Sequence, residues 1–232
     1  MLPVWKLIGF ILYVILYYSV LDVYTVWPTE SFKSVFFKVM PVMHLVFVVI
    51  STSMDDDVKV KSSRYRWNTV LGLITCGIGD CCMIFADCFN AGSIMFAIAH
   101  LFYIRAFGIY PMGSKPMAAS FAVAAVAVYF FLIDMLPMSL FKVAGITYLL
   151  VIITMAWRSM VILHSEKSFG SFLACFGAIL FMVSDILLTV DKFHESFSRA
   201  PFWVMLTYYG AQLGLALSAC DTHSQYSIKK DY

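Results

Sequence analysis

Apolar residues along the chain form long unbroken runs instead of alternating with polar ones. Each run is close to the roughly 20 residues that an α-helix needs to cross a bilayer. The runs lie near residues 3–21, 33–52, 67–87, 91–110, 117–136, 138–163, 168–190 and 201–220. Because lipid cannot hydrogen-bond exposed backbone groups, and the runs lack the strict alternation of a membrane barrel, they are expected to be helices. The pattern predicts an all-α polytopic membrane protein with about eight transmembrane helices in one bundle.

The connections between the runs are too short to hold a second domain. They carry turn residues and charges, and they lie at 27–30, 53–66, 89–92, 113–116 and 191–199. The first run is predicted to be a retained span, because Lys6 lies at its start and no clear small-residue cleavage site follows Tyr18. No internal repeat is evident, so residues 1–232 are expected to form a single transmembrane domain.

Composition supports the same class of protein. Of the 232 residues, 62% are hydrophobic and 13% are charged, whereas soluble domains average about 25% charged residues. A soluble fold could not cover that much apolar surface. The formal net charge of +2 is ordinary, which argues against nucleic acid as a partner. Membrane lipid is the expected surrounding, and the sequence leaves the oligomeric state open.

Lysine and arginine are unevenly divided between the two sides of the predicted bundle. With eight spans both termini lie on one side, and that side holds Lys6, Lys59, Lys61, Arg64, Arg66, Arg105, Lys115, Arg158, Lys167, Lys229 and Lys230. The other side holds Lys33, Lys38, Lys142, Lys192 and Arg199. Because positively charged loops stay in the cytoplasm, both termini are predicted to be cytoplasmic.

The last residues of the chain suggest a compartment. Lys229 and Lys230 stand close to the C-terminus, in the manner of the dilysine retrieval signal of endoplasmic-reticulum membrane proteins. A solvated basic tail is the alternative reading. Localisation in the endoplasmic reticulum is therefore a hypothesis that the predicted cytoplasmic C-terminus permits.

Ionisable groups within spans are costly in lipid, and by default they face the bundle interior and have a function. Asp80 lies deep in the predicted third span and Asp185 in the seventh. The other deeply placed polar groups are Lys38, His44, His100 and Gln212, with Tyr103, Tyr208 and Tyr209 nearby on their helices. Helical spacing places Asp185 on one face with Phe181, and it places His100 on one face with Tyr103. A shared pocket is expected.

The predicted topology puts Lys38, Asp80 and Asp185 in the non-cytoplasmic half of the membrane. Two carboxyls brought together at low dielectric cannot both ionise cheaply, so such a pair should hold a proton near neutral pH. General acid and base catalysis needs such a group. The alternative is structural: each aspartate hydrogen-bonds within the bundle or pairs with Lys38.

The sequence offers little support for a protease site or a zinc site. Gly77, Gly79 and Asp80 match the GxGD motif of intramembrane aspartyl proteases, but the companion motifs of that family are missing or out of order. Membrane histidines are too few for a three-histidine zinc site. The sequence thus implies no metal and no cofactor.

The order of short motifs resembles the lysoplasmalogenases, the YhhN-like multi-pass membrane enzymes that hydrolyse the vinyl ether bond of lysoplasmalogens. The motifs run from Lys38 to Gln212, and they are Lys38 to Pro41, Gly79-Asp80, Phe96 with His100 to Tyr103, Gly177 to Phe181 leading into Ser184-Asp185, and Tyr208 to Gln212. Each motif is short and unspecific alone. Their order in a chain of this length makes the combination fairly specific.

The resemblance implies a membrane hydrolase with Asp80 and Asp185 in its catalytic site and a lysophospholipid as substrate. Vinyl ethers yield to acid, so one aspartate would donate the proton while the other stabilises the cation and guides water. The supporting residues would be Lys38, His100, Tyr103, Ser184, Tyr208, Tyr209 and Gln212. Lys38 would meet the lipid phosphate or pair with an aspartate. A proton-coupled transporter and a non-catalytic scaffold are the rival classes.

Overall fold

The structure is a computed structural model that describes residues 5–53, 63–133 and 139–221. These residues form eight α-helices, one short 3₁₀ helix (η1) and no strand, so the predicted all-α class is confirmed. The α-helices are α1 (Trp5–Leu21), α2 (Phe32–Ser53), α3 (Ser63–Met83), α4 (Phe89–Phe107), α5 (Lys115–Ile133), α6 (Ser139–Glu166), α7 (Phe169–Phe193) and α8 (Ala200–Ala219). The predicted dilysine tail and the acidic part of the loop at 53–66 lie outside the described residues.

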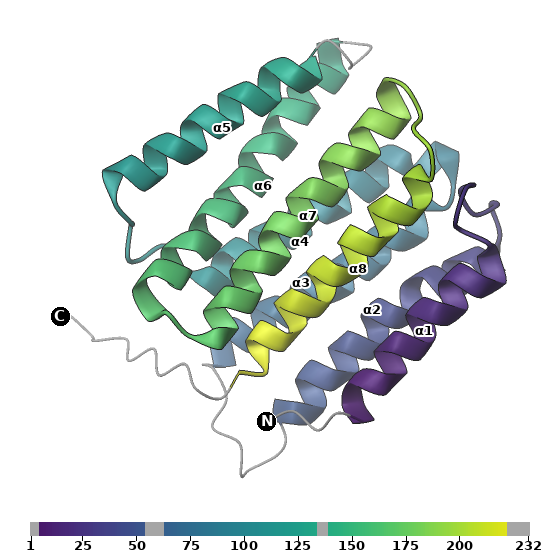
Figure 1. Cartoon of the computed structure of the whole chain (residues 1–232), viewed down its shortest axis with the longest axis horizontal. Coiled ribbons are helices and arrows are strands. Elements are labelled where there is room, and N and C mark those ends of the chain that lie inside the picture. Colours follow the sequence, from purple (N-terminus) through teal and green to yellow (C-terminus); the bar gives the residue numbers. More distant parts are fainter. Residues whose placement is uncertain (1–4, 54–62, 134–138, 222–232) are drawn as a thin grey trace.

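The helices run up and down in one bundle with nearly parallel axes (Figure 1), and the start of α1 and the end of α8 lie at the same end. Most sequence neighbours pack side by side, but α4 packs against α6 rather than against α5, and α8 also lies against α2 and α3. Helix α8 therefore lies between α7 on one side and α2 and α3 on the other. At the periphery, α5 packs mainly against α6.

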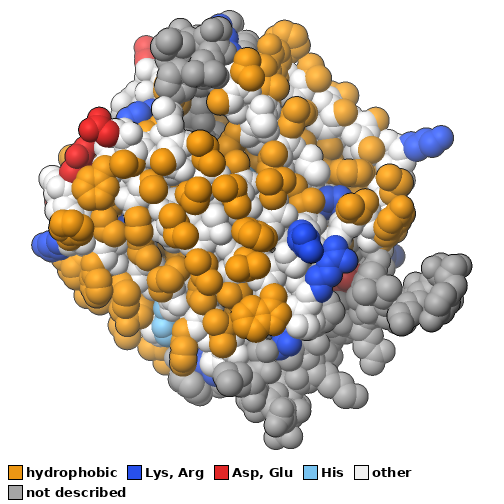
Figure 2. Space-filling view, turned by 180° about the vertical axis from the view of Figure 1, so that it is seen from behind, with side chains coloured by type: hydrophobic (Ala, Val, Ile, Leu, Met, Phe, Trp, Pro, Cys, Tyr) orange, Lys and Arg blue, Asp and Glu red, His pale blue; other side chains and the backbone are white. Residues whose placement is uncertain are grey.

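Four helical segments are long and apolar enough to cross a membrane, and they are Phe32–Thr52, Ala86–Phe107, Lys142–Glu166 and Phe169–Phe193. The apolar segments of α1 and α5 are shorter. Helices α3 and α8 are less apolar because they face the interior, where they bury polar side chains such as Asn68 and Gln212. Figure 2 shows one face of the bundle, which is apolar across its middle. The described residues therefore support a membrane protein with four candidate spans, and the predicted count of eight spans is not confirmed.

The third helix lies about one turn earlier in the sequence than predicted. The apolar pattern predicts it near 67–87, whereas it spans Ser63–Met83 and is followed by η1 (Ala86–Cys88). The charged residues Arg64 and Arg66, which suggest a loop in the sequence, belong to its first turns. As a result, Asp80 lies in the last turn of α3 and not deep along it, and its burial comes from the helices packed around it.

Small residues set the distance between α7 and α8. A Cβ on Gly177 would lie 2.8 Å from the backbone oxygen of Ala211, and one on Gly214 would lie 3.1 Å from the Cα of Gly177. The two helices therefore touch through their backbones. The start of α7 is fixed by a capping box, because the hydroxyls of Ser168 and Ser171 each accept a hydrogen bond from the other's backbone N–H. These contacts hold α7 in register beside α8.

Two glycines of α3 allow aromatic rings to pack close to its backbone. A Cβ on Gly79 would lie 3.2 Å from the ring of Phe96, and one on Gly72 would lie 2.5 Å from the ring of Tyr103. The rings of Phe96 and Tyr103 on α4 therefore pack directly against the backbone of α3. This packing brings the inner face of α4 close to the aspartates of α3 and α7.

Candidate functional site

Asp80 forms the centre of a buried polar cluster between α2, α3 and α8. Its Oδ1 lies 3.6 Å from Lys38 Nζ, and its Oδ2 accepts a hydrogen bond of 2.5 Å from the Tyr208 hydroxyl. All three side chains are buried. The neighbouring Tyr209 donates to the backbone oxygen of Lys38 at 2.9 Å. Of the two roles predicted for Lys38, the structure shows the ion pair with an aspartate.

Asp185 lies in a second cluster, between α4, α6 and α7. Its Oδ2 accepts a hydrogen bond of 2.5 Å from the Tyr148 hydroxyl. His100 Nε2 lies 3.0 Å from that hydroxyl and 3.4 Å from Asp185 Oδ2. Asp185 Oδ1 makes no hydrogen bond with any residue that the structure describes. One oxygen of this carboxyl is therefore held by donors, while the other is left for a ligand or water.

The two aspartates do not form the directly coupled carboxyl pair that the sequence predicts. Each has its own partners, and rings lie between the clusters. The Phe181 ring packs on His100, with centroids 4.6 Å apart, and on Tyr208, with centroids 5.5 Å apart. Phe96 packs edge-on against Phe181. The reason is geometric: Phe181 stands one helical turn before Asp185 on the same face, so its ring fills the space between the clusters.

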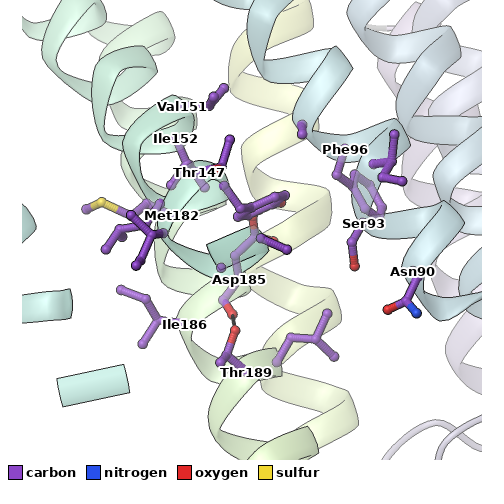
Figure 3. Close-up of a pocket in the computed structure, with 18 of the residues that line it drawn as sticks. Asn90, Ser93, Phe96, Thr147, Val151, Ile152, Met182, Asp185, Ile186 and Thr189 are labelled. Carbon is purple, nitrogen blue, oxygen red and sulfur yellow. Dashed lines mark hydrogen bonds between the residues drawn. The ribbon is translucent and has the colours of Figure 1, made fainter. Parts of the chain in front are cut away.

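A cavity of about 670 Å³ lies between α4, α6 and α7. Asp185 lines it, whereas Asp80 does not. Figure 3 shows Asp185 among the side chains of α6 and α7, with Asn90, Ser93 and Phe96 of α4 on the opposite side. The lining is apolar apart from a few groups, which are Asn90, Ser93, Tyr129, Thr147, Tyr148, Asp185 and Thr189.

The cavity opens sideways, toward the surface that would face lipid. Ile94 and Leu101 line it, and yet they are 58% and 52% exposed. Both belong to α4, at whose edge the cavity meets the outside of the bundle. Because an apolar chain gains free energy wherever it leaves water, such an opening suits a ligand that arrives from the bilayer. A hydrocarbon chain fits this cavity better than a polar solute does.

The other predicted site residues link helices and do not line the cavity. The Tyr103 hydroxyl donates to Gln212 Oε1 at 3.1 Å, which joins α4 to α8. The Ser184 hydroxyl donates to the backbone oxygen of Val204 at 2.9 Å, which joins α7 to α8. His44 lies away from both clusters, with Nε2 2.9 Å from the backbone oxygen of Lys6. These hydrogen bonds give each of the three polar side chains a partner within the bundle.

Tyr148 is the site residue that sequence reasoning missed. It lies in a long apolar run, without a charged neighbour to mark it. Only the tertiary fold shows that its hydroxyl contacts both Asp185 and His100. Among the described residues, no group of three histidine, cysteine or acidic side chains could hold a metal ion.

The sequence profile of the YhhN family matches residues 33–219. The chain belongs to the YhhN family. The matched range includes both aspartate clusters and every helix that lines the cavity, so the family's shared region is the region that builds the site.

Several curated relatives of this YhhN-family chain carry lysoplasmalogenase names. Lysoplasmalogenase TMEM86B of Rattus norvegicus is 32% identical over 200 residues, which cover 84% of this chain and 78% of the relative. The Mus musculus protein of the same name is 32% identical, over 82% of this chain and 76% of the relative. Lysoplasmalogenase TMEM86A of Bos taurus is 33% identical, over 66% of this chain and 65% of the relative. No solved structure matches the chain.

Proposed function

We propose that this chain is an integral membrane lysoplasmalogenase, which hydrolyses the vinyl ether bond of a lysoplasmalogen to a fatty aldehyde and a glycerophospho-alcohol. The names of its relatives support this activity. One structural observation carries the proposal: the Asp185 carboxyl, held on one oxygen by Tyr148, lies in an apolar cavity that opens sideways. An acid at such a place can reach the ether bond of a lipid that has not left the membrane.

The proposed reaction begins with transfer of the Asp185 proton to the alkenyl carbon β to the ether oxygen. This forms a C–H bond and leaves an oxocarbenium ion beside the new carboxylate. Water adds to the cationic carbon and returns a proton to Asp185, giving a hemiacetal. The bond from that carbon to the glycerol oxygen then breaks, and the hydroxyl proton moves to the departing oxygen. One water is consumed, and the acid is regenerated.

Tyr148 and His100 act on this acid through hydrogen bonds. Since the Tyr148 hydroxyl donates to Asp185, it can itself accept a hydrogen bond from His100 Nε2. A chain of donors that ends on a carboxylate stabilises the charge left after the proton has gone. Because these hydrogen bonds use only the Oδ2 atom of Asp185, its Oδ1 atom remains available to the substrate.

The Asp80 cluster supports the Asp185 site indirectly, through the aromatic rings that lie between the two clusters. Tyr208 hydrogen-bonds to Asp80 and packs against Phe181, whose ring in turn packs against His100. The ion pair of Lys38 with Asp80 thus fixes the ring that supports the second cluster. Asp80 is a positioning residue in this proposal, while Asp185 contacts the substrate.

We also propose how the helices are arranged in the membrane. We place all eight helices across the bilayer, with both termini in the cytoplasm and the protein in the endoplasmic reticulum. The orientation is supported by the excess of lysine and arginine on the side of the termini, and the spans by the up-and-down packing of the helices (Figure 1). The compartment is proposed from Lys229 and Lys230 alone. In this orientation Asp80 and Asp185 lie toward the lumenal end.

Aldehyde release from purified protein tests the proposed activity. A lysoplasmalogen should be cleaved, while the saturated ether analogue should be inert, because it has no double bond to protonate. The 1-acyl lysophospholipid should turn over poorly, because among the described residues no serine or cysteine with a paired base lines the cavity. If the acyl lipid were the better substrate, the chain would be an esterase and the proposal would be wrong.

A further inference from the structure

The cation of Lys192 lies near one end of the cavity, and the proposed reaction does not use it. Lys192 follows Asp185 by seven residues on α7, which is two helical turns, and Thr189 lies between them on the same face. Lys192 Nζ lies over the ring of Phe89, 5.1 Å from its centroid. That ring packs edge-on against Phe193, with centroids 5.8 Å apart. Lys192 does not itself line the cavity, but Phe89 and Phe193 both do, so the ammonium group lies just outside the lining at this end of the cavity.

A second polar group stands at the same end of the cavity. Asn90 follows Phe89 at the start of α4 and lines the cavity (Figure 3). Its side-chain amide makes no hydrogen bond with a residue in the described part of the chain. An ammonium and an amide at one end of an apolar cavity are suited to an anionic group with an attached hydrocarbon chain.

The spacing along α7 matches the dimensions of the substrate. Seven residues of α-helix rise about 10 Å, which is the axial separation of Lys192 and Asp185. In a lysoplasmalogen, seven bonds join the phosphorus to the alkenyl carbon that is protonated, and such a chain spans about 8 Å when extended. The distance from the ammonium group to the phosphate and the distance from the carboxyl to the alkenyl carbon add to this length. One lipid can therefore reach both residues at once.

We propose that Lys192, assisted by Asn90, binds the phosphate of the lysophospholipid and so sets the depth at which the vinyl ether meets Asp185. This inference rests on the proposed function for its substrate. It replaces the phosphate-binding role predicted for Lys38, which is buried in the ion pair with Asp80. Beyond the acid, the alkenyl chain leaves by the sideways opening at Ile94 and Leu101.

Substitution of Lys192 tests the inference when combined with removal of the phosphate. For lysoplasmalogen, Lys192→Met should raise KM about tenfold and leave kcat nearly unchanged, as expected when binding common to ground state and transition state is lost. For the phosphate-free 1-alkenylglycerol, the same variant should behave like the wild type. Lys33→Met is the matched control, because Lys33 is an exposed lysine at the same end of the bundle and does not line this cavity.

Binding of the saturated ether lysophosphocholine separates the inference from the proposed activity, since it requires no turnover. Lys192→Met should weaken its Kd about tenfold, while Lys33→Met should leave the Kd unchanged. Equal Kd values for wild type and Lys192→Met would overturn the inference even if aldehyde release were normal. A wild type that bound the analogue through Lys192 and yet released no aldehyde would refute the activity and leave the phosphate site standing.

Discussion

Asp185→Asn should abolish aldehyde release from lysoplasmalogen while the protein stays folded. The amide keeps the shape of the side chain and can still accept the Tyr148 hydrogen bond, but it has no proton acidic enough for carbon. Loss of a general acid costs roughly 10² to 10⁴ in rate. The measurement is kcat of the purified variant, with thermal unfolding in the same detergent to show that the fold is intact.

Two tyrosine variants show whether the loss comes from the chemistry of the carboxyl. Tyr148→Phe removes a hydrogen bond to a charged group, typically about 1.5–3 kcal/mol, so kcat should fall by roughly 10- to 100-fold. Tyr129→Phe removes a hydroxyl that also lines the cavity but is not a partner of Asp185, and it should leave kcat nearly unchanged. Full activity of Asp185→Asn would remove this residue from the mechanism.

Asp80→Asn should lower both stability and activity, for a reason different from that at Asp185. The variant leaves the Lys38 ammonium buried without its carboxylate. Breaking a buried ion pair at one partner costs about 3–5 kcal/mol. Tyr208 also loses its charged acceptor, so the support of Phe181 weakens. Thermal unfolding and aldehyde release, measured on the same preparation, should both decline.

The double variant Lys38→Met with Asp80→Asn tests the positioning role. It removes the unpaired charge, so thermal stability should return toward the wild-type value and part of the activity should return with it. A double variant with restored stability and no activity would show that the Asp80 carboxyl takes part in the chemistry. The same conclusion would follow if Asp80→Asn alone kept its stability and lost only hydrolysis.

The helices could be predicted from the sequence because a membrane span needs a long apolar run, and such runs are visible without tertiary information. The limits of α3 could not, since its first turns carry Arg64 and Arg66 on a helix that continues beyond its apolar stretch. Likewise α8 is apolar only in part, because its polar groups point into the bundle. Hydropathy alone describes lipid-facing helices better than central ones.

The polar residues of the site were predictable by type, whereas their grouping was not. Asp80 and Asp185 stand out because carboxyls are rare in spans. Which groups share a cluster depends on how the helices are rotated and stacked, and the ring of Phe181 divides what looked like one site. Tyr148 carries no charge, so nothing in its apolar run distinguished it from a packing residue.

In the proposed reaction the enzyme places a proton on the alkenyl carbon. Hydrolysis of a lysoplasmalogen in deuterium oxide, with the aldehyde trapped at once by reduction to prevent later exchange, tests it most directly. We expect one deuterium on the carbon next to the former carbonyl, transferred from the exchanged acid at Asp185. Trapped aldehyde without deuterium at that carbon would contradict protonation of the alkenyl carbon, and with it the role given to Asp185.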